Sequence, residues 1–142
     1  MAGNAESPEH RASQVRLLDP EGAISPTGPW SVGARAGDHV YVAGMRGIDP
    51  TTNTLVEGDA ARIRQGFVNM LTIAASEGAG PADAVRLVVY VTDMARHRPL
   101  VNDAQTEIWG EGPYPPRTIV EVSRLNQDDI FEVEGTFFAP RN

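Results

Sequence analysis

The segment from residue 59 to residue 77 constrains the fold of this chain more than any other. Its apolar side chains recur at i, i+4, i+7, i+8 and i+11, which places them on one face of an α-helix. These side chains are Ile63, Phe67, Met70, Leu71 and Ala74. Asp59 can cap the start of the helix, and Gly78 lies just past its end. A helix with one apolar face buries that face against another layer of structure, so the segment predicts a layered fold.

The rest of the chain predicts a second helix and five strands. The second helix is expected to run from Pro99, in its first turn, to residue 109, with an apolar stripe of Leu100, Val101, Ala104 and Ile108. The strands are expected at residues 30–35, 39–45, 85–92, 118–123 and 131–138. A hairpin is expected at residues 36–38 and a loop at residues 48–53. The order β-β-α-β-α-β-β is typical of an α+β fold, a two-layer sandwich in which two helices back a mixed sheet.

Domain organisation and assembly can also be predicted. The length of 142 residues suits one domain. Residues 1–22 are polar and lack periodicity, so we expect a flexible tail there and a single domain over residues 23–142. The almost continuous apolar run over residues 85–92 indicates a strand covered on both faces. Two helices cover one face of the sheet, so we expect further copies of the chain to cover the other.

The sequence lacks both lysine and cysteine, because all twelve residues of its Lys+Arg count are arginine. Schiff-base nucleophiles, pyridoxal aldimines and Walker-type phosphate loops need lysine and are therefore excluded. Thiolate nucleophiles, disulfides and cysteine-ligated metal centres are excluded as well. The three histidines, His10, His39 and His97, show no metal-ligand spacing. We therefore expect neither a metal site nor a cofactor.

The charge and hydropathy pattern narrows the possible partners. The net charge of −7 argues against a nucleic-acid binder. Such a protein needs a surplus of basic side chains, which neutralise phosphates and release their counterions. No apolar run approaches the roughly 18–20 residues of a membrane span. The N-terminal residues contain no apolar core of a secretory signal, so a cytoplasmic location is expected.

Arginines and carboxylates at strand ends remain as candidates for chemistry. Arg117 follows two prolines and opens a strand, where its planar, permanently charged fork can bind a carboxylate. The alternative is that Arg117 pairs with a nearby acidic side chain. Glu132 shares one strand face with Glu134, and the alternative for both is a solvated sheet face. Asn102 lies off the apolar stripe of its helix, which by itself indicates a surface position.

Five blocks of the sequence, in uninterrupted order over about residues 26–140, resemble the RidA family, also called YjgF/YER057c/UK114. They are GPWSVGARAGDHVYVAG, NMLTIAASEGAGPADAVRLVVYVTDM, VN, PPRTIVEVSRL and FEVEGTFFAP. The most specific part is the Pro-x-Arg-[ST] and V-E-V-x-x-L block followed by the Glu-x-Glu strand. The resemblance implies a chorismate-mutase-like fold and a homotrimer whose sheets pack inward into a barrel, with sites in clefts between subunits.

The resemblance also implies an activity. Enzymes of the family hydrolyse reactive enamines and imines to 2-oxo acids and ammonia, without a cofactor. By position, Arg117 would bind the substrate carboxylate and Glu132 would orient the hydrolytic water. Asn102 and the backbone at Gly44 would border the cleft. The sequence leaves open whether Arg117 and Glu132 in one cleft come from one subunit or two.

Several positions depart from the family pattern. Trp30 replaces a common tyrosine, Ala43 and Met45 flank Gly44 where Ser-Gly-Gln is common, and Ile119 replaces a cysteine or another small residue. The site thus loses hydroxyls and gains apolar bulk, which argues for a substrate other than 2-aminoacrylate. Arg46 could hold a second carboxylate, as in 2-aminomuconate, or be a solvated loop arginine.

Two rival functions remain open from the sequence. One is a non-catalytic protein that binds carboxylate metabolites in the same cleft. The other is a ribonuclease, an activity attributed to some members of the family, against which the acidic balance of the chain counts.

Overall fold

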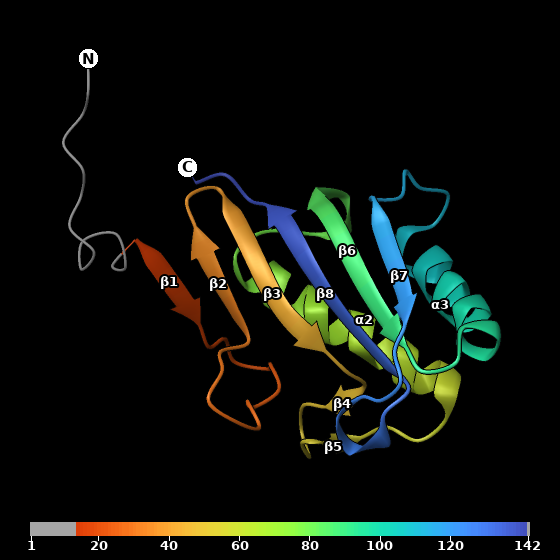
Figure 1. Ribbon diagram of the computed structural model, residues 1–142. Helices are drawn as coiled ribbons and strands as arrows, with labels where there is room; N and C mark the ends of the chain where they lie inside the picture. The colour runs from red at the N-terminus through yellow and green to blue at the C-terminus, as the bar shows by residue number, and fades with distance from the viewer. Residues whose placement is uncertain (1–13, 142) are drawn as a thin grey trace.

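A six-stranded mixed sheet runs through the part of the protein that the computed structural model describes, residues 14–141 (Figure 1). Its strands, in spatial order, are β1 (Val15–Leu18), β2 (Gly33–Ala36), β3 (His39–Met45), β8 (Phe131–Phe138), β6 (Ala84–Val91) and β7 (Arg117–Glu121). All neighbouring strands are antiparallel except β6 and β7. This parallel pair needs a crossover connection, which the helix between the two strands supplies.

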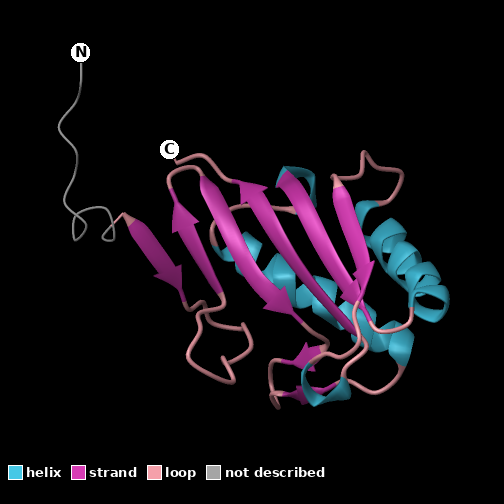
Figure 2. Cartoon of the chain, viewed as in Figure 1, coloured by secondary structure: helices cyan, strands magenta, loops and turns pink. Residues whose placement is uncertain are grey.

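Two long helices, α2 (Asp59–Ser76) and α3 (Met94–Trp109), lie on the same side of the sheet (Figure 2). A small two-stranded ribbon is formed by β4 (Ile48–Asp49) and β5 (Thr54–Leu55), where the sequence predicts only a loop. Two short 3-10 turns, η1 (Pro81–Asp83) and η2 (Asn126–Asp128), precede β6 and β8. The two-layer α+β architecture predicted from the sequence is therefore confirmed.

The core lies between α2 and the sheet. Of the predicted stripe on α2, Ile63, Phe67, Met70 and Ala74 are fully buried and Leu71 is half-buried at its edge. The opposing layer consists of Leu87, Val89, Val91, Phe131, Val133 and Phe137, all with no exposed surface. The Phe67 and Phe131 rings lie 5.3 Å apart between their centroids. The strict alternation along β8 turns its apolar residues to α2 and its glutamates to the opposite face.

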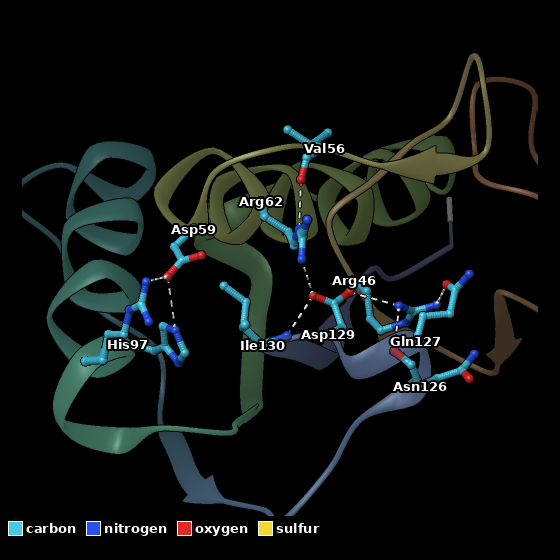
Figure 3. Close-up of polar contacts among 10 residues, drawn as sticks. Arg46, Val56, Asp59, Arg62, His97, Asn126, Gln127, Asp129 and Ile130 are labelled. Atoms are coloured by element: carbon cyan, nitrogen blue, oxygen red, sulfur yellow. Dashed lines mark hydrogen bonds and ion pairs between the residues drawn. The ribbon is translucent and has the colours of Figure 1, made fainter.

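The predicted start of the second helix at Pro99 is wrong. α3 begins five residues earlier because Asp93 provides an N-cap, with its carboxylate accepting a hydrogen bond from the Arg96 backbone N–H at 3.1 Å. Pro99 then lies inside the helix, where its ring removes one backbone hydrogen bond. The early start also places His97 inside α3, next to Asp59 at the start of α2 (Figure 3).

The predicted tail over residues 1–22 extends too far along the chain. Residues 15–18 of that segment form β1, which pairs with β2 in an antiparallel register. The strand escapes sequence patterning because its side chains are exposed except for Leu18, so no alternation of apolar and polar residues marks it. Backbone hydrogen bonds to β2 hold it in the sheet. The predicted tail residues 1–13 lie outside the described residues.

The sheet face away from the helices carries large apolar side chains. Tyr41, Val120 and Phe138 are each between 38% and 47% exposed on this face. The ring centroids of His39 and Phe138 lie 5.6 Å apart in an edge-to-face contact. Within one chain β6 is covered on the helix face only, as its alternating burial shows, whereas the sequence predicts cover on both. None of the helices among residues 14–141 is long and apolar enough to cross a membrane.

Candidate active site

The predicted site residues fall into two separate pockets. The arginine pocket is lined by Asn102, Gln105, Thr106, Tyr114, Pro115 and Arg117. The glutamate pocket is lined by Ile24, Thr27, Trp30, Ala43, Gly44, Arg46, Ile48, Asn126 and Glu132. The first pocket lies between α3 and the start of β7, and the second lies where β3 and β8 approach η2.

Arg117 is held in the arginine pocket by neutral groups. One of its terminal nitrogens, Nη1, donates to Oδ1 of Asn102 at 2.9 Å and to Oε1 of Gln105 at 3.0 Å. No carboxylate forms an ion pair with Arg117 in the described part of the chain. Burial, and secondly the positive charge of Arg98, lower the pKa of Arg117, although a guanidinium stays charged in proteins. A partly desolvated cation with neutral partners suits an anionic ligand.

Gln105 is a site residue that sequence reasoning missed. Its side chain is buried, and it lies three residues after Asn102 on the same face of α3. The signal was present, since Arg98, Asn102 and Gln105 follow one another at helical spacing. Once the predicted helix starts at Pro99, Arg98 falls outside it and the row of polar side chains is no longer visible. Asn102 is half-buried and accepts from Arg117, so the surface alternative for it is wrong.

Glu132 lies in the glutamate pocket with its carboxylate packed against Gly44. A Cβ atom at position 44 would overlap the Oε2 and carboxyl carbon of Glu132, so the close approach requires glycine. Burial raises the pKa of Glu132. The negative charges of Glu134 and Asp129 raise this pKa further, whereas the positive charge of Arg46 lowers it. Glu132 is half-buried, which differs from the solvated alternative. A raised pKa makes its carboxylate a stronger base than an exposed glutamate.

Arg117 and Glu132 point to opposite faces of the sheet. Arg117 is level with Leu87 on β6, and Leu87 is buried against the helices. Glu132 is level with Tyr90, three residues further along the same strand. Since side chains alternate along a strand, positions three apart face opposite ways. One chain therefore does not bring the two residues into one cleft.

Comparisons with known proteins agree with this fold. A model of the endoribonuclease L-PSP family matches residues 20–138. A solved Rhodopseudomonas palustris structure, described as a "probable translation initiation inhibitor", is 54% identical, with a TM-score of 0.87 over 89% of this chain and 99% of that one. The solved structure of RidA from a Psychrobacter species is 29% identical, with a TM-score of 0.82 over 87% and 98% of the two chains.

The chain belongs to the RidA family. A relative from Salmonella typhimurium named 2-iminobutanoate/2-iminopropanoate deaminase is 31% identical over 84% of this chain and 94% of its own. The family thus includes proteins named as imine deaminases, which supports this type of activity at the level of the family. The resemblance seen in the sequence, and the YjgF-type fold that it implies, are confirmed.

Of the positions that depart from the RidA pattern, some line the glutamate pocket and none lines the arginine pocket. Trp30 and Ala43 line the glutamate pocket, where Ile24 and Ile48 add further apolar surface. Ile119 does not border either pocket and packs against the core on the helix face of β7. The predicted gain in apolar bulk therefore belongs to the glutamate pocket and comes from Trp30 together with two isoleucines that sequence reasoning did not single out.

Arg46 is neither a solvated loop residue nor a free cation. Its side chain is buried, and Nη1 donates to Asp129 Oδ2 at 2.8 Å and to the Asn126 carbonyl at 3.2 Å. Nη2 donates to Gln127 Oε1 at 2.8 Å (Figure 3). The guanidinium is committed to these partners, so the arrangement does not favour Arg46 as an anchor for a second substrate carboxylate. Among the described residues, no group of three or more acidic or histidine side chains is placed to hold a metal ion.

Proposed function

We propose that this RidA-family protein is a hydrolytic deaminase of enamine or imine intermediates that carry a carboxylate, producing a 2-oxo acid and ammonia. The observation that carries the proposal is Arg117, a partly buried arginine whose described partners are two neutral amides. A substrate carboxylate can supply the missing negative charge through a bidentate pair. Glu132, with its raised pKa, provides a base for activating water.

The reaction needs only side chains and water in this scheme. Arg117 binds the carboxylate and fixes the adjacent imine carbon. Glu132 accepts a proton from a water molecule as the water oxygen bonds to the carbon of the protonated imine, giving a neutral carbinolamine. Glu132 then returns the proton to nitrogen. The C–N bond breaks as the C=O bond forms, the hydroxyl proton passes to Glu132, and ammonia leaves. Imines hydrolyse spontaneously, so positioning of water and substrate supplies much of the acceleration.

The active site in this proposal joins two copies of the chain. Arg117 and Glu132 face opposite sides of one sheet, so a substrate that contacts both needs Arg117 from one copy and Glu132 from another. The exposed apolar side chains on the open sheet face, such as Tyr41 and Phe138, support packing of sheet against sheet. A homotrimer, the assembly implied by the sequence resemblance, brings such pairs together in the clefts between subunits. We expect this assembly in the cytoplasm.

The function is tested by measuring ammonia release from imines generated in situ by an amino-acid oxidase. We expect faster release than in buffer, with imines of larger apolar amino acids preferred over 2-aminoacrylate because Ile24, Trp30 and Ile48 line the glutamate pocket. A protein that binds 2-oxo acids but leaves every imine at its buffer rate would instead be a metabolite-binding protein. RNA at low salt serves as the control for the ribonuclease alternative, which the net charge of −7 opposes.

Mixing two inactive variants tests whether the site is shared between copies. Arg117→Ala subunits keep Glu132, and Glu132→Gln subunits keep Arg117. When the two are refolded together, some interfaces contain both wild-type residues, so we expect ammonia release to reappear. The measurement is activity of the co-refolded mixture against the two variants refolded separately. Activity that stays at the level of the separate variants would show that the site is built within one chain.

A further inference from the structure

We propose that Arg46, clamped by Asp129, is a positioning residue for Glu132: it fixes the wall of the glutamate pocket and supplies the positive charge beside the Glu132 carboxylate. This inference rests on the proposed role of Glu132 as the base. Arg46 does not touch the substrate in this scheme, because its guanidinium is already bound to protein oxygens.

The anchor of this arrangement is Asp129, three residues before Glu132 in the chain. Its side chain has no exposed surface, and it meets Arg46 Nη1 at 2.8 Å and Arg62 Nη1 at 3.5 Å (Figure 3). Its Oδ1 also accepts the backbone N–H of Ile130 at 2.7 Å. Asp129 therefore ties the entry of β8, where Glu132 lies, to the end of β3 and to α2.

The backbone at Arg46 is fixed from the other side by a buried amide. Asn69 of α2 donates from Nδ2 to the carbonyl oxygens of Arg46, at 3.0 Å, and Ile48, at 2.7 Å. Gly44, whose Cα faces the Glu132 carboxylate, lies two residues before Arg46. The segment against which Glu132 packs is thus held by polar contacts at both the main chain and the side chain of Arg46.

Four charged or titratable groups act on the Glu132 carboxylate or lie beside it. Arg46 is the positive one, and Asp129 and Glu134 are negative. Tyr90, level with Glu132 on β6, donates its hydroxyl to Glu134 at 2.6 Å. Arg46 and Asp129 oppose each other in their effect on the pKa of Glu132, and the lowering by Arg46 is the larger of the two effects. Removing Arg46 alone should raise the pKa of Glu132, and removing Asp129 alone should lower it.

Two single substitutions should therefore move the acid limb of the pH–activity profile, where activity falls as Glu132 becomes protonated, in opposite directions. Arg46→Gln removes the positive charge and is expected to shift the limb of kcat/KM to higher pH by on the order of one unit. Asp129→Asn removes the negative charge and should shift it to lower pH. In the double variant the two effects offset each other in part, so the limb should lie between those of the two single variants. A merely structural pair would lower activity in both variants without moving the limb in opposite directions.

Controls separate charge from packing. Arg46→Lys keeps the charge and loses the fork, so the limb should stay in place. Arg62 lines neither pocket, and Arg62→Gln removes only the longer contact to Asp129. This variant should therefore lower stability without moving the acid limb. Loss of one partner of a buried pair is strongly destabilising. Asp129→Asn is the milder change, since its amide oxygen can still accept from Ile130 and Arg46 keeps Asn126 and Gln127 as acceptors.

A second readout makes the test independent of turnover. The titration of the Glu132 carboxyl carbon, followed by NMR and assigned with Glu132→Gln, should show the same opposite shifts. If the wild type does not hydrolyse imines, the proposed function fails while this titration still reports on Arg46. An unchanged Glu132 titration in Asp129→Asn, or shifts of the same sign in both single variants, would overturn the inference.

Discussion

Replacing Arg117 by alanine is expected to lower kcat/KM for imine hydrolysis by roughly 30- to 5,000-fold. For substrates that the wild type accelerates only weakly, the rate should fall to that of spontaneous hydrolysis in buffer. The magnitude corresponds to a loss of about 2–5 kcal/mol when one partner of a buried, hydrogen-bonded charge pair is removed. Here the remaining partner would be the substrate carboxylate, left beside Asn102 and Gln105 with no cation. Ammonia release from imines generated in situ measures the effect.

Two further variants give this prediction its controls. Arg117→Lys keeps the charge but loses the planar fork, so we expect partial activity with a raised KM. Arg64→Ala removes an exposed arginine on α2 that pairs with Glu107, and its activity should match the wild type. Full activity in Arg117→Ala, with the fold intact by circular dichroism, would contradict the assignment of Arg117 as the carboxylate anchor.

Replacing Glu132 by glutamine is expected to lower kcat by about 100- to 10,000-fold, the usual contribution of general acid–base catalysis. Glutamine keeps the shape that packs against Gly44 but cannot accept the proton of the attacking water. Substrate binding through Arg117 should be retained, so KM should change little. Steady-state kinetics with one preferred imine would show this separation of kcat from KM.

The same substitution should remove the acid limb of the pH profile. The active form of Glu132 is the carboxylate, so activity falls as the pH drops through its pKa. Burial raises that pKa above the usual 4.5, and the limb of the wild type should therefore lie above pH 4.5. Glu134→Gln is the matched control on the same strand face, and it should keep both activity and an acid limb. An acid limb that persists in Glu132→Gln would assign it to another group.

Much of the fold could be predicted because it is encoded by local patterns. The helical stripe of α2 and the alternation along β3 and β8 fixed which faces are buried, and the observed bounds of β3 and β8 agree with the prediction. The errors arose where local signals compete or are missing. An N-cap at Asp93 overrode the preference of Pro99 for a first turn, and β1 lacks a buried face that would mark it.

The sequence could predict which residues belong to the candidate site, but only part of how they are arranged in space. Arg117 and Glu132 could be selected from their strand contexts and from the family resemblance. Gln105 was missed because the predicted helix began after Arg98. Asp129 was missed because its importance depends on a contact with Arg46, which lies 83 residues away in the chain. The alternative of Arg46 as a solvated loop arginine failed because of this same long-range contact.

By itself, the sequence determined the two-layer α+β fold, the buried face of each main element and the absence of lysine and cysteine chemistry. These properties depend on residue type and on periodicity within one element. Only the tertiary structure decided that Arg117 and Glu132 face opposite sides of the sheet and that Arg46 is buried against Asp129. The relation of Arg117 to Glu132 depends on the register of β7 and β8 against β6. The contact between Arg46 and Asp129 depends on how the residues before β8 pack against the end of β3. Both bring together segments far apart in the chain, and no local pattern encodes their alignment.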